Sequence, residues 1–298
     1  MSRIFEALQR AEVERRTSQL SEEEPFITEG FLSDQEDPQP DEPGVVLEDI
    51  VRHAWTPSIA SFPTLANRGA GVEQFRSLRS RIYQARYESP LKTILISSGL
   101  PSEGKSFVAA NLAMSLARNS DNNILLIDGD LRRPTLHSLL GAPNEPGLSE
   151  FLAEKAELRD IMQRDCSPKI PDSTLEGSTS NLTFIPAGKC GDNSSELVAN
   201  RRIERLIAAL APKFDWILID SPPVLAVTDA VEIAHAADAV LLVARGGETT
   251  FAVAQSTQAT FVNSRILGFV LNDVKDAPSS DYKYHGYYGK PDVAHRPR

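Results

Sequence analysis

The residues with the clearest chemistry in this chain form a glycine-rich run, 99–106, that reads Gly-Leu-Pro-Ser-Glu-Gly-Lys-Ser. It fits the pattern G-x-x-x-x-G-K-[ST], in which backbone N–H groups curl around phosphates. Lys105 is expected to reach the β- and γ-phosphates of a nucleotide, and the Ser106 hydroxyl is expected to face Mg²⁺. The run therefore predicts a nucleotide-phosphate site. We assign to this site Gly99, Pro101, Ser102, Glu103, Gly104, Lys105, Ser106 and the adjoining Phe107.

The segments around this run have the composition that the motif needs. Residues 93–97 form a β-branched, apolar run typical of a strand, and 107–117 are rich in Ala and Leu without an internal Gly or Pro. A loop between a strand and a helix places the positive end of the helix dipole behind the phosphates. This context favours a working phosphate loop over a chance glycine-rich turn.

A single acid, Asp220, ends the apolar run 216–219, and Pro222 and Pro223 stop the strand after it. A carboxylate held at a strand end can bind Mg²⁺ directly or through water. A strand-ending Asp can also serve as a helix cap or a turn residue. Because a phosphate loop lies upstream, we favour the metal role, with Ser106 as the second ligand.

Two more acids, Asp128 and Asp130, follow the apolar run 124–127. Ordinary P-loop enzymes need one strand-ending acid for the metal, so this pair predicts a further task. A carboxylate near Mg²⁺ and the γ-phosphate can accept the proton of an attacking hydroxyl. We expect Asp128 to be this base and to approach the metal, with Asp130 in the same catalytic set. The alternative is a turn in which Asp130 pairs with Arg132 or Arg133.

Four of the six tyrosines in the chain lie close together near its C-terminus. They are Tyr282, Tyr284, Tyr287 and Tyr288. Their polar surroundings, with Gly, Pro and Lys, cannot build a hydrophobic core. One interpretation is a tail that binds a partner. The sharper interpretation is that these hydroxyls accept phosphoryl groups.

The pattern of apolar runs predicts the scaffold that positions these groups. Short apolar strands alternate with helical stretches, which is typical of a parallel sheet covered by helices on both faces. Ligands of such sheets bind beyond the carboxyl ends of the strands, where the phosphate loop, Asp128 and Asp220 lie. We therefore expect a three-layer α/β fold of the P-loop NTPase type with a mostly parallel central sheet. The predicted strands are 93–97, 123–128, 182–185, 214–220, 239–244 and 266–272, and the predicted helices are 71–88, 107–117, 134–140, 147–154, 195–211, 228–236 and 249–263.

Composition divides the chain into four parts. Residues 1–16 have the spacing of a short helix, 52–275 hold the phosphate-loop domain, and 276–298 form a flexible, tyrosine-rich tail. The stretch 17–51 contains eleven acids and no Lys or Arg, so we expect a disordered acidic linker there. Outside the linker, acids and bases nearly balance. This balance argues against binding nucleic acid through a basic surface.

Cysteine content and hydropathy indicate the compartment. Cys166 and Cys190 are the only cysteines, and no secretory signal is visible, so we expect a reduced, cytosolic environment. The longest apolar runs are too short to span a bilayer. Any link to a membrane is therefore expected to go through a partner or a surface helix.

With these motifs, the chain resembles the cytoplasmic catalytic domain of the bacterial tyrosine autokinases (BY-kinases) of capsule and exopolysaccharide export. The resemblance covers about 73–288 and implies a nucleotide-binding role for Asn272. Glu73, Arg76 and Arg79 match the Glu-x-x-Arg-x-x-Arg oligomerisation motif of that family, although the bare pattern also fits a solvated helix face. The other matching motifs are the phosphate loop, the segment Asp128–Arg132, the segment Asp220–Pro223, the segment Val270–Asn272 and the tyrosine cluster.

The resemblance implies ATP and Mg²⁺ as cofactors and autophosphorylation of the tyrosine cluster in trans, within a homo-oligomeric ring. It also implies control of polysaccharide polymerisation and export, and a cognate tyrosine phosphatase as a partner. Many fused homologues carry a transmembrane domain, which this chain lacks. We therefore expect a stand-alone kinase, held at the inner face of the cell membrane by a separate activator of the polysaccharide co-polymerase type. One departure is the segment 188–197, which lacks the prolines that the family often has there.

Two other functions use the same fold. A partitioning or septum-placement ATPase carries a signature Lys just after the first glycine of the loop, and this chain has Leu100 there. That difference counts against a partitioning ATPase. A non-catalytic ATP-binding regulator, whose tail only binds a partner, predicts nucleotide binding without phosphotyrosine and stays open.

Overall fold

The structure is a computed structural model that describes residues 46–57, 60–65, 69–166, 181–189, 194–199 and 201–274. The predicted N-terminal helix, the acidic linker up to residue 45, Cys190 and the four clustered tyrosines lie outside these residues. The expectations about them therefore stay predictions.

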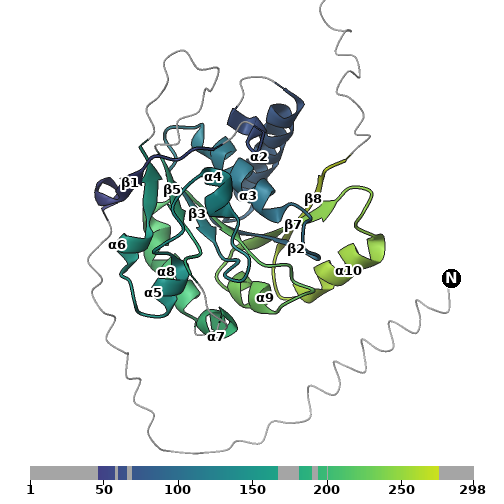
Figure 1. Cartoon of the computed structure of the whole chain (residues 1–298). Helices are drawn as coiled ribbons and strands as arrows, with labels where there is room; N and C mark the ends of the chain where they lie inside the picture. Colours follow the sequence, from purple (N-terminus) through teal and green to yellow (C-terminus); the bar gives the residue numbers. More distant parts are fainter. Residues whose placement is uncertain are drawn as a thin grey trace, which may run out of the picture. The chain divides into compact units, whose positions relative to one another are not determined.

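An eight-stranded sheet forms the centre of the described chain (Figure 1). Its strand order is β1-β4-β5-β3-β6-β2-β7-β8, and every neighbouring pair is parallel except β4 with β5. The predicted mostly parallel sheet is thereby confirmed. The strands are β1 (Val51–His53), β2 (Thr93–Ser98), β3 (Ile124–Asp128), β4 (Gln163–Asp165), β5 (Leu182–Ile185), β6 (Trp216–Asp220), β7 (Ala239–Arg245) and β8 (Ile266–Asn272).

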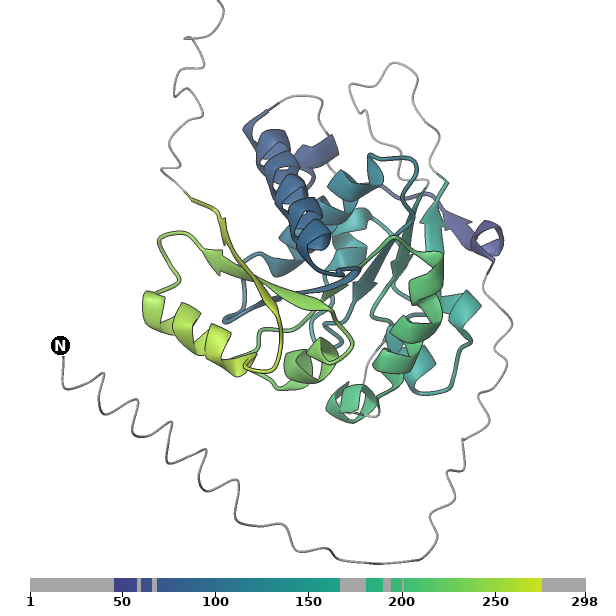
Figure 2. The same cartoon turned by 180° about the vertical axis from the view of Figure 1, so that it is seen from behind.

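Helices cover both faces of this sheet, which confirms the three-layer prediction (Figures 1 and 2). The helices α2, α3 and α4 pack on one face, and α5 to α10 lie on the other. The first group is α2 (Ala70–Glu88), α3 (Lys105–Ala117) and α4 (Leu136–Leu140). The second group is α5 (Leu148–Leu152), α6 (Leu158–Ile161), α7 (Ser194–Ala199), α8 (Arg202–Leu210), α9 (Asp229–Ala234) and α10 (Phe251–Thr260). Within the described ranges there are also three short 3₁₀ helices: η1 (Leu47–Asp49), η2 (Pro63–Leu65) and η3 (Ala211–Lys213).

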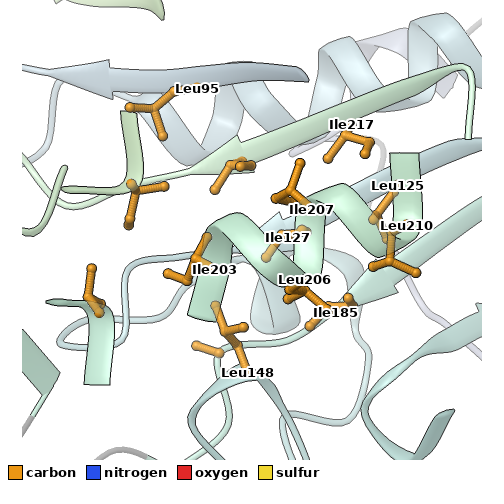
Figure 3. Packing of buried hydrophobic residues seen from close by; sticks show 14 of the residues in the cluster. Leu95, Leu125, Ile127, Leu148, Ile185, Ile203, Leu206, Ile207, Leu210 and Ile217 are labelled. Atoms are coloured by element: carbon orange, nitrogen blue, oxygen red, sulfur yellow. The ribbon is translucent and has the colours of Figure 1, made fainter. Parts of the chain in front are cut away.

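The central strands are apolar because their side chains alternate between two buried faces. Along β2, Ile94 and Ile96 pack with α2 to α4, whereas Leu95 packs with the helices on the opposite face. Figure 3 shows side chains of this second face, among them Leu206 of α8 and Ile127 of β3, which belong to one buried cluster. A strand buried on both faces reads as a continuous apolar run. The central strands were predictable for this reason.

The prediction of one continuous helix over 195–211 is wrong. The structure divides it into α7 and α8, and Arg201 between them has a φ of 53°. A residue in the left-handed region cannot continue a right-handed helix. Neither Gly nor Pro marks this break in the sequence.

Secondary structure is also present in a segment where none was expected. Residues 46–51 were assigned to the acidic linker, but Leu47–Asp49 form η1, Ile50 is buried in the core and β1 begins at Val51. The strands β1 and β4 were not predicted. Each of these strands has only three residues, most of them polar, so neither strand is visible in the sequence as an apolar run.

Candidate active site

Three neighbouring strands, β3, β6 and β2, bring the predicted groups to one edge of the sheet. Asp128 ends β3, Asp220 ends β6, and the two residues are paired in register. The phosphate loop follows β2 and leads into α3, as predicted. The fold thus gathers motifs that lie far apart in the sequence.

The phosphate loop has a backbone shape that depends on glycine. Gly104 directly precedes α3 with a φ of 91°, and a Cβ at this position would lie 1.9 Å from Nδ2 of Asn272. The same Nδ2 donates a hydrogen bond to the carbonyl oxygen of Glu103 at 3.0 Å. The end of β8 therefore braces the loop. The first N–H groups of a helix have no partner within it, so those of α3 are available for phosphate oxygens.

Glu103 supports the loop from inside. Its side chain is buried, and its carboxylate accepts the backbone N–H of Leu100 at 2.7 Å and the hydroxyl of Thr249. Gly99 packs against α10, because a Cβ there would lie 2.2 Å from Oγ1 of Thr257. The sequence assigned Glu103 and Gly99 to nucleotide binding, and the structure places both where they shape the loop.

Two short contacts join the catalytic candidates. Nζ of Lys105 lies 2.9 Å from Oδ2 of Asp130, and Oγ of Ser106 donates to Oδ2 of Asp220 at 2.5 Å. Burial lowers the pKa of Lys105, but the carboxylates of Asp220 and Asp130 outweigh it, so the pKa is raised and the amine stays charged. Asp130 also accepts the backbone N–H of Arg133 at 3.0 Å. The carboxylate of Asp130 is therefore aimed at the lysine of the predicted phosphate loop.

Asp128 lies beneath this pair and is fully buried. One carboxylate oxygen accepts the N–H groups of Thr135 and Leu136 at 3.2 and 3.1 Å, and the other accepts the N–H of Asp130 at 3.3 Å. Burial and the nearby carboxylate of Asp220 raise the pKa of Asp128 well above its usual value. The buried side chain therefore favours its protonated form more than an exposed aspartate does.

The residues at the end of β6 fit a magnesium ion. Oδ1 of Asp220 is buried and has no hydrogen-bond partner within the described part of the chain. Burial raises the pKa of Asp220 to about 6, although Lys105 and the Ser106 hydroxyl favour its ionised form. No cluster of three or more His, Cys, Asp or Glu side chains among the described residues could hold a metal by itself. Mg²⁺ is commonly held by one or two carboxylates together with substrate phosphates, and this site offers that arrangement.

A cavity of about 860 Å³ opens above these groups. Its floor includes the phosphate loop and Asp130, and an arginine-containing segment forms another wall. The lining residues from the loop are Pro101, Ser102, Gly104, Lys105, Ser106 and Phe107. A third wall is apolar and consists of Pro222, Pro223, Ala226 and Val227. The cavity therefore joins a phosphate site to a surface that suits an aromatic ring.

A second cavity, of about 610 Å³, adjoins the other side of the loop. Ser102 and Phe107 contribute to both cavities, and Asn272 lines the second one. Arg245 and Asp273 also line it and form an ion pair at 2.7 Å. Asn272, which the family resemblance assigned to nucleotide binding, thus lies beside the loop.

The sequence analysis named Arg132 as a possible partner of Asp130, but it missed the partners that Arg132 has in the structure. Nε of Arg132 lies 2.9 Å from Oδ2 of the buried Asp229, and the hydroxyl of Ser195 donates to Oδ1 of Asp229 at 3.0 Å. These residues come from the segment that follows β3, from α9 and from α7. They carry no short-range sequence signal, because only the fold brings them together.

The predicted oligomerisation residues lie on α2. Arg76 and Glu73 form an exposed ion pair at 2.5 Å, whereas NH1 of Arg79 donates to the carbonyl oxygen of Ser115 at 2.6 Å. Glu73 and Arg76 are therefore accessible to another molecule, and Arg79 also ties α2 to α3.

Comparisons with known proteins agree with these motifs. A family model described as an AAA domain matches residues 91–260. The tyrosine-protein kinase YwqD of Bacillus subtilis is 33% identical over 223 residues, which cover 74% of this chain and 87% of YwqD. The tyrosine-protein kinase ptk of Acinetobacter johnsonii is 34% identical over 220 residues, 72% of this chain. This chain spans only 28% of the length of ptk.

Solved structures show the same relationship. The kinase domain of the Escherichia coli tyrosine kinase ETK has a TM-score of 0.62 and 34% identity, and the match covers 72% of this chain and 79% of that domain. The cell division ATPase MinD of Pyrococcus furiosus is less similar, with a TM-score of 0.51 and 27% identity over 63% of this chain and 74% of MinD. The P-loop NTPase fold is therefore confirmed. None of the described helices has both the length and the apolar character needed to cross a lipid bilayer.

The phosphate loop, the two strand-ending aspartates, and the sequence and structural relatives all agree. The chain belongs to the family of bacterial tyrosine-protein kinases.

Proposed function

We propose that this chain is an ATP-dependent protein-tyrosine kinase that phosphorylates its own C-terminal tyrosine cluster in trans. The observation that carries the proposal is the meeting of Lys105, Ser106 and the three aspartates beneath a cavity with an apolar wall. A phosphate site alone would serve any nucleotide hydrolase. The apolar wall adds a place for the ring of a tyrosine.

Stabilisation of charge is the main task of the phosphate loop in this mechanism. Lys105 and the N–H groups at the start of α3 stabilise the transferring phosphoryl group. Ser106 and Asp220 would hold Mg²⁺, which when bound neutralises charge on the β- and γ-phosphates. The carboxylate of Asp130 contacts Lys105 at 2.9 Å, so it would compete with a phosphate for the amine of this lysine.

Asp128 is the proposed base. A tyrosine hydroxyl, with a usual pKa of about 10, must lose its proton as its oxygen attacks the γ-phosphorus. A carboxylate whose pKa burial has raised accepts that proton near neutral pH more readily than an exposed one. Asp130 lies on the cavity surface and positions Lys105. We therefore expect Asp128→Asn to remove phosphoryl transfer while nucleotide still binds.

The second cavity is the proposed site of the nucleotide base. It adjoins the phosphate loop at Ser102 and Phe107, and Asn272 is one of the residues that line it. An amide can both donate to and accept from the edge of a purine. Asn272→Ala is expected to weaken ATP binding, although the loss of its hydrogen bond to Glu103 would contribute to the effect.

The cellular setting is proposed from the family. From the resemblance to this family, we expect the chain to form a homo-oligomeric ring. We also expect it to work with a separate membrane activator and a cognate tyrosine phosphatase. The chain would then act at the inner face of the cell membrane and regulate polysaccharide polymerisation or export. In this arrangement, residues 17–45 connect an N-terminal docking helix to the kinase domain, and residues 276–298 carry the acceptors.

Intact mass after incubation with Mg-ATP tests the activity directly. The sample is dephosphorylated first and compared with Lys105→Met and with a variant in which Tyr282, Tyr284, Tyr287 and Tyr288 are all Phe. Steps of one phosphate in the unmodified protein, absent from both variants, would support the proposal. ATP binding without any added phosphate, with or without a membrane activator, would favour the regulator instead.

A further inference from the structure

Two neighbouring arginines on the wall of the main cavity have different surroundings. Arg132 is neutralised by the buried Asp229, whose second oxygen is held by Ser195. The side chain of Arg133 is exposed, and its guanidinium forms no ion pair with any residue that the structure describes. Arg133 therefore presents a positive charge to whatever enters the cavity.

The backbone of Arg133 is anchored to the catalytic pair. Its N–H donates to one oxygen of Asp130 at 3.0 Å, and the other oxygen of Asp130 lies 2.9 Å from Nζ of Lys105. Three residues of chain span at most roughly 10 Å, so a group bound by Arg133 stays close to the phosphoryl donor.

Charge identifies the class of ligand. Residues 276–298 contain four basic and three acidic side chains, so the unmodified tail has no net attraction to an arginine. Each phosphorylated tyrosine adds about −1.5 to −2 charges and three acceptor oxygens. A guanidinium binds a phosphate through two parallel hydrogen bonds. Tyr282 and Tyr284 are two residues apart, which is roughly 7 Å in an extended chain.

We propose that Arg133 binds a phosphotyrosine of the tail while a neighbouring tyrosine occupies the cavity, so that the first phosphate promotes the next. This inference rests on the proposed function and adds an order to it. In each transfer, the tyrosine oxygen forms a bond to the γ-phosphorus, the bond to the leaving ADP breaks and the hydroxyl proton passes to the base. Arg133 is a positioning residue in this step.

Peptide binding tests the inference without any need for turnover. The probe is a synthetic peptide of residues 279–290, either unmodified or phosphorylated on Tyr284, added to the dephosphorylated full chain with Mg-ADP. The unmodified protein should bind the phosphopeptide about tenfold more tightly than the plain peptide, as expected for a charge-assisted hydrogen bond. Arg133→Ala should abolish this preference, and Arg133→Lys should retain part of it.

Arg159→Ala is the matched control. Arg159 is an exposed arginine on α6 that pairs with Glu157 outside the cavity, so its loss should leave the preference unchanged. A preference that persists in Arg133→Ala, or one that disappears equally in the control, would overturn the inference.

A time course of intact mass adds the catalytic readout. In Arg133→Ala, the rate of the second phosphate addition relative to the first should fall about tenfold, so that the singly phosphorylated chain accumulates. An unchanged ratio would contradict the proposal. If the unmodified protein gains no phosphate either alone or with a membrane activator, the kinase proposal fails, and the peptide experiment still decides whether Arg133 recognises phosphotyrosine.

Discussion

At the scale of single residues, the buried carboxylates are explained by function and not by stability. Asp220 is fully buried, and one of its oxygens has no hydrogen-bond partner in the described residues. A buried charge without a full set of partners is unfavourable, and a bound cation removes that cost. We therefore expect the nucleotide-free protein to respond to pH at this position.

Stability should fall as pH rises through the range in which Asp220 ionises. Folding raises its pKa from 3.8 to about 6, so the protonated carboxyl favours the folded state, and that advantage is lost between these two pH values. The loss from Asp220 is expected to be about 3 kcal/mol of unfolding free energy. Asp128 shifts in the same direction. Urea unfolding at several pH values, in the absence of nucleotide, measures the effect.

Asp220→Asn is the variant for this measurement. It should be more stable than the unmodified protein above pH 6 and should lose the part of the dependence on pH that comes from Asp220, while the part from Asp128 remains. Mg-ADP should then stabilise the unmodified protein more than the variant. Parallel pH profiles for the two proteins would contradict the assignment.

Gly104→Ala should weaken nucleotide binding by at least an order of magnitude. Its left-handed φ costs an alanine about 1–2 kcal/mol, and the new Cβ would in addition collide with Asn272, which braces the loop. Gly247→Ala is the control, because Gly247 has a φ of 75° with nothing within 4 Å of a Cβ. If both variants lose only stability and bind Mg-ADP normally, the bracing contact is irrelevant to the site.

At the scale of elements, α2 combines two roles. Its buried face, which includes Phe75 and Ile82, packs against the core, while Glu73 and Arg76 lie exposed on the same helix. An exposed ion pair contributes roughly 0–1 kcal/mol to folding, so this pair is available for recognition at little cost.

The double variant Glu73→Ala/Arg76→Ala should therefore shift the protein toward the monomer without a large change in unfolding free energy. Light scattering over a range of concentrations gives the mass, and thermal unfolding gives the stability. Gln84→Ala, an exposed change on the same helix, serves as the comparison. An unchanged mass in the double variant would count against α2 as an interface.

The elements also show what could be read from the sequence. The apolar runs and the phosphate-loop pattern predicted the central strands, α2, α3 and the edge of the sheet where the acids meet. The strands β1 and β4 are short and polar, so their pairing depends on the assembled sheet. The same holds for the Arg132–Asp229 pair, because contacts between distant segments leave no periodic signal in the chain.

At the scale of the whole molecule, the acceptor tyrosines and the catalytic cavity are expected to belong to different copies. Lys105→Met chains that keep the tyrosines can be mixed with chains that keep Lys105 but have phenylalanine at all four positions. Phosphate should then appear on the Lys105→Met chain, which intact mass distinguishes. Phosphate in neither chain of the mixture, when the unmodified protein is active alone, would indicate transfer within one molecule.

The last strand ends at Asn272, on the wall of the second cavity. The carbonyl oxygen of Asn272 accepts the N–H of Gly246 at 2.7 Å, and its amide holds the phosphate loop through Glu103. Only Asp273 and Val274 separate Asn272 from Lys275, a tryptic cleavage site at the start of the tail. Occupancy of the cavity should therefore slow digestion at Lys275, so that a short trypsin treatment and a gel would report whether a given molecule holds nucleotide.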